Sequence, residues 1–171
     1  MNMVPDKINN FNVYDEGNVL VGVSGEITLP NLESMSETIS GAGIAGEIDM
    51  PTPGHFGAIS IEIPFRTLYD QSFSLLSPRG RIITLRASQS SWSSTEGKLV
   101  NKGLKITLKT IPKGLDLGTI GVGKPTGSTN SLEVLYIKVE LDGKTLLELD
   151  KLNYIFVVNG EDILKDVRNQ I

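Results

Sequence analysis

The stretch LYIKVELDGKTLLELD, residues 135–150, decides the fold of this chain. Apolar side chains occupy every second position of its first seven residues, with polar, charged or aromatic side chains between them. Asp142 and Gly143 then separate this run from a second apolar run. Alternation with period two predicts strands with one packed and one wet face, and Asp-Gly predicts a type I′ turn. The stretch therefore predicts an antiparallel hairpin.

The same alternation recurs in residues 19–29, 59–66 and 104–108. One-sided strands are typical of antiparallel sheets, whereas strands of parallel sheets are apolar on both faces. The lysine-rich segment 98–113 is also predicted to be a strand, because Leu104, Ile106 and Leu108 alternate although its lysines share a helical face. The residues alone thus predict a mainly β domain with antiparallel strands.

One flanking helix is predicted over residues 68–76. Thr67 is placed to cap its N-terminus, with Asp70 three residues on, and Pro78 and Gly80 follow its end. A short C-terminal helical turn is predicted over 162–169, and turns are predicted at 15–18 and 159–160. A bulge near Asp150 would explain a switch of apolar phase there. The apolar side chains expected to pack the helix on a sheet are Tyr69, Phe73 and Leu76.

Composition excludes several classes of protein. The 171 residues include no cysteine and one histidine, His55, which excludes disulfide scaffolds, zinc ribbons, thiol nucleophiles and His-rich metal sites. The net charge of −4 argues against a nucleic-acid binder. No apolar run approaches the ~18 residues of a membrane span, and residues 1–6 lack the features of a signal peptide. We expect one soluble domain, residues 1–171, made in the cytoplasm.

Charge is unevenly distributed along the chain. Residues 1–60 carry a net charge of −7, residues 61–125 carry +6, and residues 126–171 carry −3. Such a distribution suits a protein in which opposite ends of identical copies meet, although solvated faces would produce it too.

Two long loops, residues 31–57 and 113–130, contain sequences that resemble nucleotide-binding motifs. Residues 41–46 match G-x-G-x-x-G, but Pro51 and Pro53 prevent the long helix that the motif requires. Residues 118–125 approach the phosphate loop, but Pro125 stands where a hydroxyl should bind magnesium. We predict that neither loop binds a nucleotide.

Other candidate sites are equally weak. Glu47, Asp49 and His55 lack a second imidazole for a metal site, and a Ser-His-Asp triad would have to use that same histidine. The lysines of 98–113 lack interleaved aromatic residues and favour a solvated face or a subunit contact over nucleic-acid recognition. We therefore predict no catalytic residues, cofactor or metal, and a structural or interaction protein rather than an enzyme.

The two ends of the chain resemble a known family. The order and spacing of these motifs are similar to those of the major tail tube proteins of contractile-tailed bacteriophages and related R-type bacteriocins (tailocins). The resemblance covers residues 11–50 and 132–170. The segments that carry it are 11–14, 17, 22–23, 28–30 and 41–46 near the N-terminus, and 136–139, 142–144, 148–150 and 158–160 near the C-terminus.

The resemblance implies two packed antiparallel sheets, a sandwich or split barrel with a flanking helix. In a hexameric ring the sheets join into a continuous β-barrel, and rings stack into a hollow tube inside a contractile sheath. A long loop, here about 32–57, reaches a neighbouring ring, and 113–130 is a second loop. The inter-ring contacts would be Ile39, Gly41, Gly43, Ile44, Ile48 and Met50.

The resemblance also implies partners and location. The chain would assemble with itself, the tail sheath, and baseplate and tail terminator proteins, within a virion tail or an extracellular tailocin particle. The tube would pass DNA or ions as it penetrates the target envelope, without stable membrane binding by the monomer. An acidic wall of small residues would repel DNA phosphates. The candidates for this lumen-facing wall are Ser24, Glu26, Ser60 and Glu62.

Two alternatives stay open at this point. One is a tube ring protein like that of type VI secretion systems. The other is a small-ligand-binding β-barrel or an enzyme, which would need an apolar pocket with converging polar groups.

Overall fold

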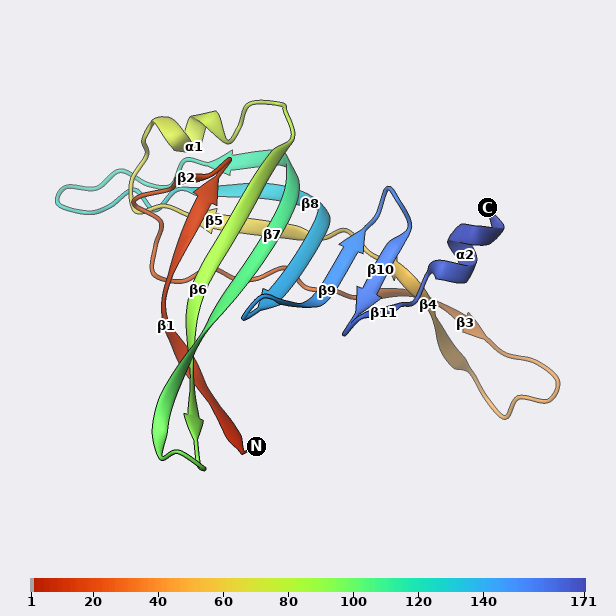
Figure 1. Cartoon of the computed structure of the whole chain (residues 1–171). Coiled ribbons are helices and arrows are strands. Elements are labelled where there is room, and N and C mark those ends of the chain that lie inside the picture. Colours follow the sequence, from red (N-terminus) through yellow and green to blue (C-terminus); the bar gives the residue numbers. More distant parts are fainter. Residues whose placement is uncertain (1) are drawn as a thin grey trace.

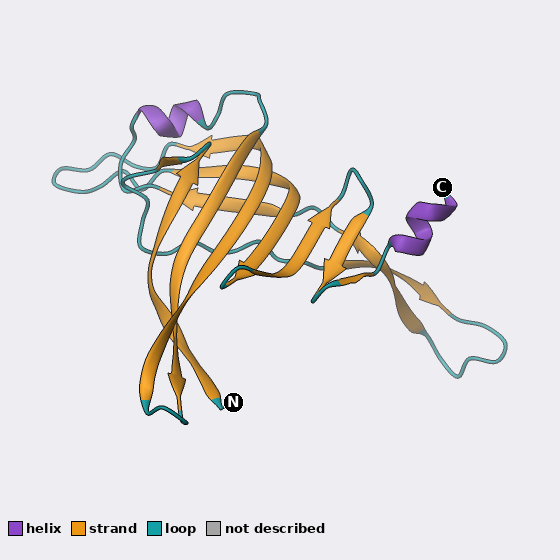
Figure 2. Cartoon of the chain, viewed as in Figure 1, coloured by secondary structure: helices purple, strands orange, loops and turns teal. Residues whose placement is uncertain are grey.

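A computed structural model describes residues 2–171, and it is mainly β with antiparallel strands (Figures 1 and 2). One sheet contains nine strands in the order β11-β10-β9-β8-β7-β6-β1-β2, with β5 paired to β8, and a separate hairpin contains β3 and β4. The elements are β1 (Met3–Asp15), β2 (Asn18–Val19), β3 (Ser34–Ile39), β4 (Ile48–Phe56), β5 (Ser60–Pro64), α1 (Asp70–Ser74), β6 (Arg81–Ser93), β7 (Lys98–Asp116), β8 (Thr129–Leu141), β9 (Lys144–Asp150), β10 (Ile155–Val158), β11 (Glu161–Asp162) and α2 (Lys165–Gln170).

Three two-residue turns connect neighbouring strands at the predicted places. In each turn both central residues have positive φ, as a type I′ turn requires. The φ values are 52° and 81° at Asp142 and Gly143 between β8 and β9, and the other turns show the same signs. The predicted hairpin over 135–150 is therefore confirmed. The other two turns are Glu16-Gly17 and Asn159-Gly160.

The large sheet bends over its own core because β8 changes partners along its length. Its first half pairs with β5 and its second half pairs with β9. Between the halves, Lys109 of β7 pairs with Tyr136 and Thr110 pairs with Val134, so Leu135 is an extra residue in β8. A bulge of this kind bends and twists a strand. The bend brings β5 across one face of the strands β1, β6 and β7.

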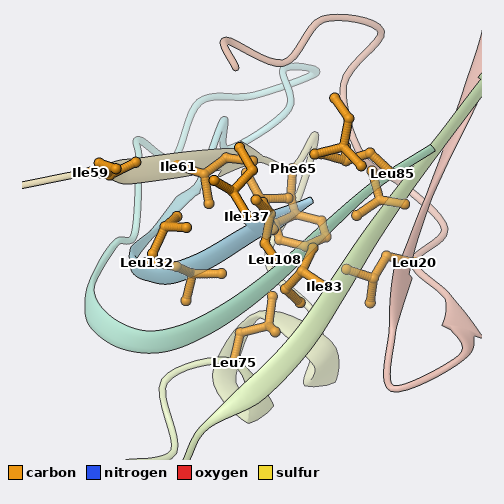
Figure 3. Close-up of a cluster of buried hydrophobic side chains, with 14 of the residues drawn as sticks. Leu20, Ile59, Ile61, Phe65, Leu75, Ile83, Leu85, Leu108, Leu132 and Ile137 are labelled. Atoms are coloured by element: carbon orange, nitrogen blue, oxygen red, sulfur yellow. The ribbon is translucent and has the colours of Figure 1, made fainter. Parts of the chain in front are cut away.

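The core lies between β5 and the curved sheet (Figure 3). Phe65 sits at its centre with no exposed surface, and Leu75, the residue after α1, closes one side. Burial of these aliphatic side chains, at roughly 25 cal/mol per Å² of apolar surface, is the main stabilising contribution. The other buried apolar residues of the cluster are Val13, Leu20, Ile59, Ile61, Ile63, Ile83, Leu85, Ile106, Leu108, Leu132, Val134, Ile137 and Leu149.

Helix α1 is present, but it is shorter than predicted and buries a different face. Tyr69 precedes it without a capping side chain, so the predicted Thr67 cap is wrong. Ser72 and Leu75 are the buried side chains, whereas Phe73 and Leu76 are 51% and 42% exposed. The predicted packing of those two residues on the sheet is therefore wrong.

Buried donors from the sheet set the orientation of α1. The Arg81 guanidinium donates to the Ser74 carbonyl at 2.6 Å, and the Asn130 amide donates to the Ser72 carbonyl at 2.9 Å. Arg81 also pairs with Asp15 at 2.8 Å. Because carbonyls at a helix C-terminus lack partners within the helix, these donors fix a helix too short to be stable alone.

Three further predictions differ from the structure. The alternating segment 19–29 contains only the end of β2 and one isolated bridge, Val23 to Phe65. The loop predicted over 31–57 contains the β3–β4 hairpin. The switch in the alternation of apolar residues near Asp150 is caused by a turn at 151–154, not by the predicted bulge. The predicted strand over 98–113 is confirmed as β7, and the C-terminal helical turn is confirmed as α2.

Within residues 2–171 the large sheet stays open, so the monomer does not form a closed barrel. Neither α1 nor α2 is long and apolar enough to cross a membrane.

Candidate assembly surfaces

The β3–β4 hairpin, residues 34–56, projects from the body as an arm (Figure 1). Ile39 pairs with Ile48, and Glu37 pairs with Met50, so these four side chains share one face. Thr38 and Asp49 occupy the opposite face, where the threonine hydroxyl donates to the carboxylate at 2.6 Å. The arm therefore has one largely apolar face and one polar face, and both are exposed.

The tip of the arm gathers the remaining residues predicted for inter-ring contact. Gly41 and Gly43 have φ values of 141° and 88°, which only glycine adopts without strain. The Ile44 amide donates to the Gly41 carbonyl at 3.1 Å, which closes the tip. The structure thus brings Ile39, Ile48 and Met50 together on one face and places the glycines and Ile44 in the turn.

The base of the arm is held by the C-terminal part of the chain. The Phe56 and Phe156 rings meet edge to face with centroids 5.1 Å apart. Gly54, at φ 74°, leaves no room for a side chain, because a Cβ there would lie 2.5 Å from a methyl group of Leu164. The Lys151 ammonium donates to the Gly57 carbonyl at 2.8 Å. The arm is therefore anchored at its base and free at its tip.

The predicted lumen-facing residues come from one strand and from one extended segment. Ser60 and Glu62 are exposed on the outer side of β5, since Ile61 and Ile63 point into the core. Glu26 is exposed and Ser24 is half-buried in the extended segment after β2. The Ser24 amide donates to the Pro64 carbonyl at 2.8 Å, which holds this segment against the end of β5.

The outer face of the large sheet is a second wet surface. Arg86, Lys105 and Glu140 pair in one row across β6, β7 and β8. Lys138 lies in the next row of this face, and Lys109 lies in the row after it. We call Arg86, Lys105, Lys109 and Lys138 the basic face.

Two cationic side chains of the basic face stack on tyrosine rings. The Arg86 guanidinium lies 5.2 Å from the ring centroid of Tyr14, and the Lys109 ammonium lies 4.8 Å from that of Tyr136. The Tyr136 hydroxyl donates to Glu148 at 3.0 Å. Burial and this acidic partner raise the pKa of Tyr136 to about 12.

Strand β1 leaves a long edge of the large sheet open. On one side it pairs with β6 along most of its length. On its other side, within the described residues, only Tyr14 and Asp15 pair with a strand, the two-residue β2. Residues 3–12 therefore present backbone donors and acceptors to any further strand.

The open edge continues into a protruding ribbon made by the start of β1, the end of β6 and the start of β7 (Figure 1). Val4, Trp92 and Leu99 pair in one row across these strands, and they are 55%, 44% and 56% exposed. The row contains the only tryptophan of the chain. An apolar row across an open ribbon is typical of a protein–protein contact.

No group of three or more His, Cys, Asp or Glu side chains in residues 2–171 is arranged to hold a metal ion. Thus Glu47, Asp49 and His55 do not form such a group in the structure. The surfaces available for assembly are the anchored arm, two solvent-exposed sheet faces and the open edge of β1.

Comparison with known proteins assigns the chain to a family. Residues 5–171 match the family described as phage tail tube protein FII. The chain belongs to the phage tail tube protein FII family. It is 29% identical over 170 residues to the tail tube protein of Escherichia phage P2, covering 98% of each chain. It is 24% identical over 163 residues to the major tail tube protein of Serratia phage KSP20, covering 95% of this chain and 93% of the relative.

A solved structure shows the same fold in another assembly. The chain resembles a chain in the cryo-EM structure of an extracellular contractile injection system, the PVC sheath/tube terminator in its extended state. The TM-score is 0.56 at 12% identity, with 80% of this chain and 96% of that chain covered. At this identity the likeness concerns the fold alone.

Membership of the phage tail tube protein FII family confirms the resemblance found at the two ends of the chain. It identifies the chain as a tail tube subunit of the phage tail and as a structural, non-enzymatic protein. It favours a phage tail tube subunit over the two alternatives, a type VI-like ring protein and a ligand-binding barrel. The family match also covers residues 66–130, which lie outside the two stretches that carry the resemblance.

Sequence reasoning missed the open edge of β1 and the apolar row across the ribbon. The edge depends on which strands pair, and pairing between distant segments leaves little trace in local sequence. A signal for the basic face was present, since Lys105 and Lys109 alternate with Ile106 and Leu108.

Proposed function

We propose that this phage tail tube protein forms hexameric rings in which the large sheets join into one continuous β-barrel. The rings stack into a hollow conduit inside a contractile sheath, and the conduit passes DNA or ions through the target envelope. The whole chain, residues 1–171, acts as one tail-tube domain. Its partners are copies of itself, the sheath, and the baseplate and tail terminator proteins.

The open edge of β1 carries the proposal of ring closure. A curved sheet with an unpaired edge over residues 3–12 continues into a barrel when a neighbouring copy supplies the next strand. In the monomer, register shifts between Pro5 and Asn10 make the edge irregular, which limits unspecific pairing. Six copies would therefore remove edges that each copy leaves open.

The arm is the proposed stacking element. Its apolar face, with Ile39, Ile48 and Met50, lies in solvent in the monomer. A neighbouring ring would bury that face, and the turn formed by Gly41, Gly43 and Ile44 would reach furthest toward the ring. The anchored base would keep the direction of the arm constant in every copy.

Two wet faces are candidates for the lumen wall. Ser24, Glu26, Ser60 and Glu62 form an acidic, small-residue wall that would repel DNA phosphates. The basic face is the second candidate, because it lies on the strands that share the open β1 edge. Whichever face turns outward would meet the sheath.

Cysteine labelling distinguishes the two faces, because the chain has no cysteine of its own. Glu62→Cys and Arg86→Cys place single thiols on the two exposed faces. In assembled tubes a bulky thiol reagent should label the outer thiol at the monomer rate and the lumen thiol much more slowly. Retained labelling of Glu62→Cys with lost labelling of Arg86→Cys would assign the lumen to the basic face.

The assembly itself is tested with purified protein. Negative-stain electron microscopy and sedimentation velocity should show six-fold rings or hollow rods, alone or with the tail terminator protein. A protein that stays monomeric at high concentration under both conditions would refute the proposal.

A further inference from the structure

A second projection, residues 117–128 between β7 and β8, forms a finger that extends away from the body (Figure 1). The Thr119 amide donates to the Thr126 carbonyl at 2.9 Å, and the Lys124 amide donates to the Gly121 carbonyl at 3.2 Å. Gly118, at φ 78°, has no room for a side chain, because a Cβ there would lie 2.0 Å from the Thr126 carbonyl oxygen. The finger is therefore a closed, specific turn.

The base of the finger is bonded to the segment after β5. The Gly127 amide donates to the Arg66 carbonyl at 2.9 Å, and the Leu68 amide donates to the Thr126 hydroxyl at 3.0 Å. These bonds fix the direction of the finger relative to the core, since Phe65 is buried next to Arg66.

The tip of this fixed finger is apolar. Ile120 is 96% exposed and Val122 is 103% exposed, so neither side chain touches the rest of the molecule. Presenting two aliphatic side chains to water on a structured projection gives the monomer no stability. Such a tip suits insertion into an apolar site.

The same chain has an apolar groove of about 620 Å³. It lies between β1, the segment 19–29 and the facing parts of β6 and β7. Val21 and Leu29 stand on its rim and are 73% and 49% exposed. Further lining residues are Phe11, Val23, Ile27, Leu85, Leu104 and Ile106.

Charge also matches between finger and groove. Residues 117–128 contain Lys124 and no acidic residue. The residues that line the groove include Glu26 and no lysine or arginine. The groove therefore favours a finger with a single positive charge over an acidic segment such as the arm.

We propose that the finger of one copy inserts Ile120 and Val122 into the groove of a second copy, with Lys124 near Glu26. The finger does not occupy the groove of its own chain, because Ile120 and Val122 are fully exposed and no finger residue lines the groove. A contact between two different patches is heterologous, so it generates rings or open stacks rather than closed dimers. This inference rests on the proposed self-assembly and names a second contact for it, independent of the arm. A groove filled by a finger would cover Glu26, which would leave Ser60 and Glu62 of β5 as the acidic candidate for the lumen wall.

The first experiment makes the tip polar. Ile120→Asp with Val122→Asp should leave the monomer's melting temperature and circular dichroism unchanged, because both side chains are fully exposed. It should raise the protein concentration needed for tube formation by about tenfold or more, as loss of a buried contact does. The matched control, Ile120→Val with Val122→Ile, keeps the tip apolar and should assemble as the wild type does.

The second experiment detects the contact itself. Val122→Cys with Leu29→Cys, in a chain without other cysteines, should give a ladder of disulfide-linked copies when assembled protein is oxidised. The control pair is Val122→Cys with Leu152→Cys, which places the second thiol on the exposed β9–β10 turn. It should give no ladder and at most a faint band of disulfide-linked dimers.

The outcomes separate the two proposals. If wild-type protein never assembles, the proposed function fails. If wild-type tubes form but the aspartate variant assembles at the same concentration, or assembled Val122→Cys with Leu29→Cys gives no ladder, only the finger–groove contact is overturned.

Discussion

Arg81 connects the core to helix α1, and its loss should be costly. Its guanidinium is 7% exposed and bonds both the Asp15 carboxylate and the Ser74 carbonyl. Arg81→Met should lower the free energy of unfolding by about 3–5 kcal/mol, because it leaves a carboxylate with little solvent and no counter-charge. Urea unfolding of the monomer measures this change. Arg66→Met is the surface control, with an expected effect within about 0.5 kcal/mol.

The Arg81 prediction has an internal check. If the cost comes from the unpaired Asp15, the double variant Asp15→Leu with Arg81→Met should recover part of the lost stability. A loss under about 1 kcal/mol for Arg81→Met alone would contradict the assigned role.

Tyr136 should give the protein an alkaline transition. Burial and the hydrogen bond to Glu148 raise its pKa from 10.0 to about 12 in the folded state. The unfolded chain therefore loses this proton first, and the stabilising contribution is fully present below pH 10 and declines as the pH rises toward 12. Wild-type protein should lose more stability over this interval than Tyr136→Phe.

Ultraviolet titration of the phenolates tests the same assignment. Of the four tyrosines of the chain, the last to ionise should be absent in Tyr136→Phe. Four tyrosines titrating together near pH 10 in the folded protein would contradict the raised pKa.

At the scale of elements, the two faces of the arm should behave differently. Ile48→Ser with Met50→Ser removes apolar surface from one face and should prevent ring stacking while rings still form. Thr38→Ala with Asp49→Ala removes the hydrogen bond of the other face and should leave stacking intact. Electron microscopy of both variants would distinguish single rings from rods. Equal stacking of the two variants would exclude the apolar face from the contact.

A deletion tests the whole tip of the arm. Replacing residues 39–50 by a short Gly-Ser turn should preserve the melting temperature of the monomer, because these residues lie outside the core. Rods formed by this variant would remove the arm from the stacking mechanism.

Elements set by local chemistry could be predicted from the sequence, and elements set by distant contacts could not. The Asp142-Gly143 turn follows from two residues that tolerate positive φ. Leu75 rather than Phe73 faces the core, because side-chain donors from Arg81 and Asn130 fix the orientation of α1. Both donors lie outside the helix, so the spacing of apolar residues within it could not predict this orientation.

The same division holds for the assembly surfaces. The apolar residues of the arm were predictable, since Ile39, Ile48 and Met50 flank a glycine-rich turn. The segment 19–29 alternates as a strand does, but beyond Val19 of β2 it pairs with another segment only through the Val23–Phe65 bridge. The open edge of β1 is likewise a property of pairing, so it became visible only with the fold.

At the scale of the whole molecule, the arm and the finger project from opposite ends (Figure 1). Residues 31–57, which contain the arm, carry four acidic residues and no lysine or arginine. Beside α1 and the finger stand Arg66, Arg79 and Lys124. Stacked copies would bring the acidic end of one ring toward the basic end of the next, and attraction across that boundary would help to hold the tube together.

Salt should therefore weaken the tube. The screening length falls from about 10 Å at 0.1 M salt to about 3 Å at 1 M, which suppresses attraction between exposed charges but leaves apolar contacts in place. Assembled tubes should shorten or release rings as sodium chloride rises over this range, measured by pelleting and by rod length in electron micrographs. Sucrose at equal osmolality is the control and should not shorten them. Rods of unchanged length at 1 M salt would show that apolar contacts alone, those of the arm and the finger, hold the rings together.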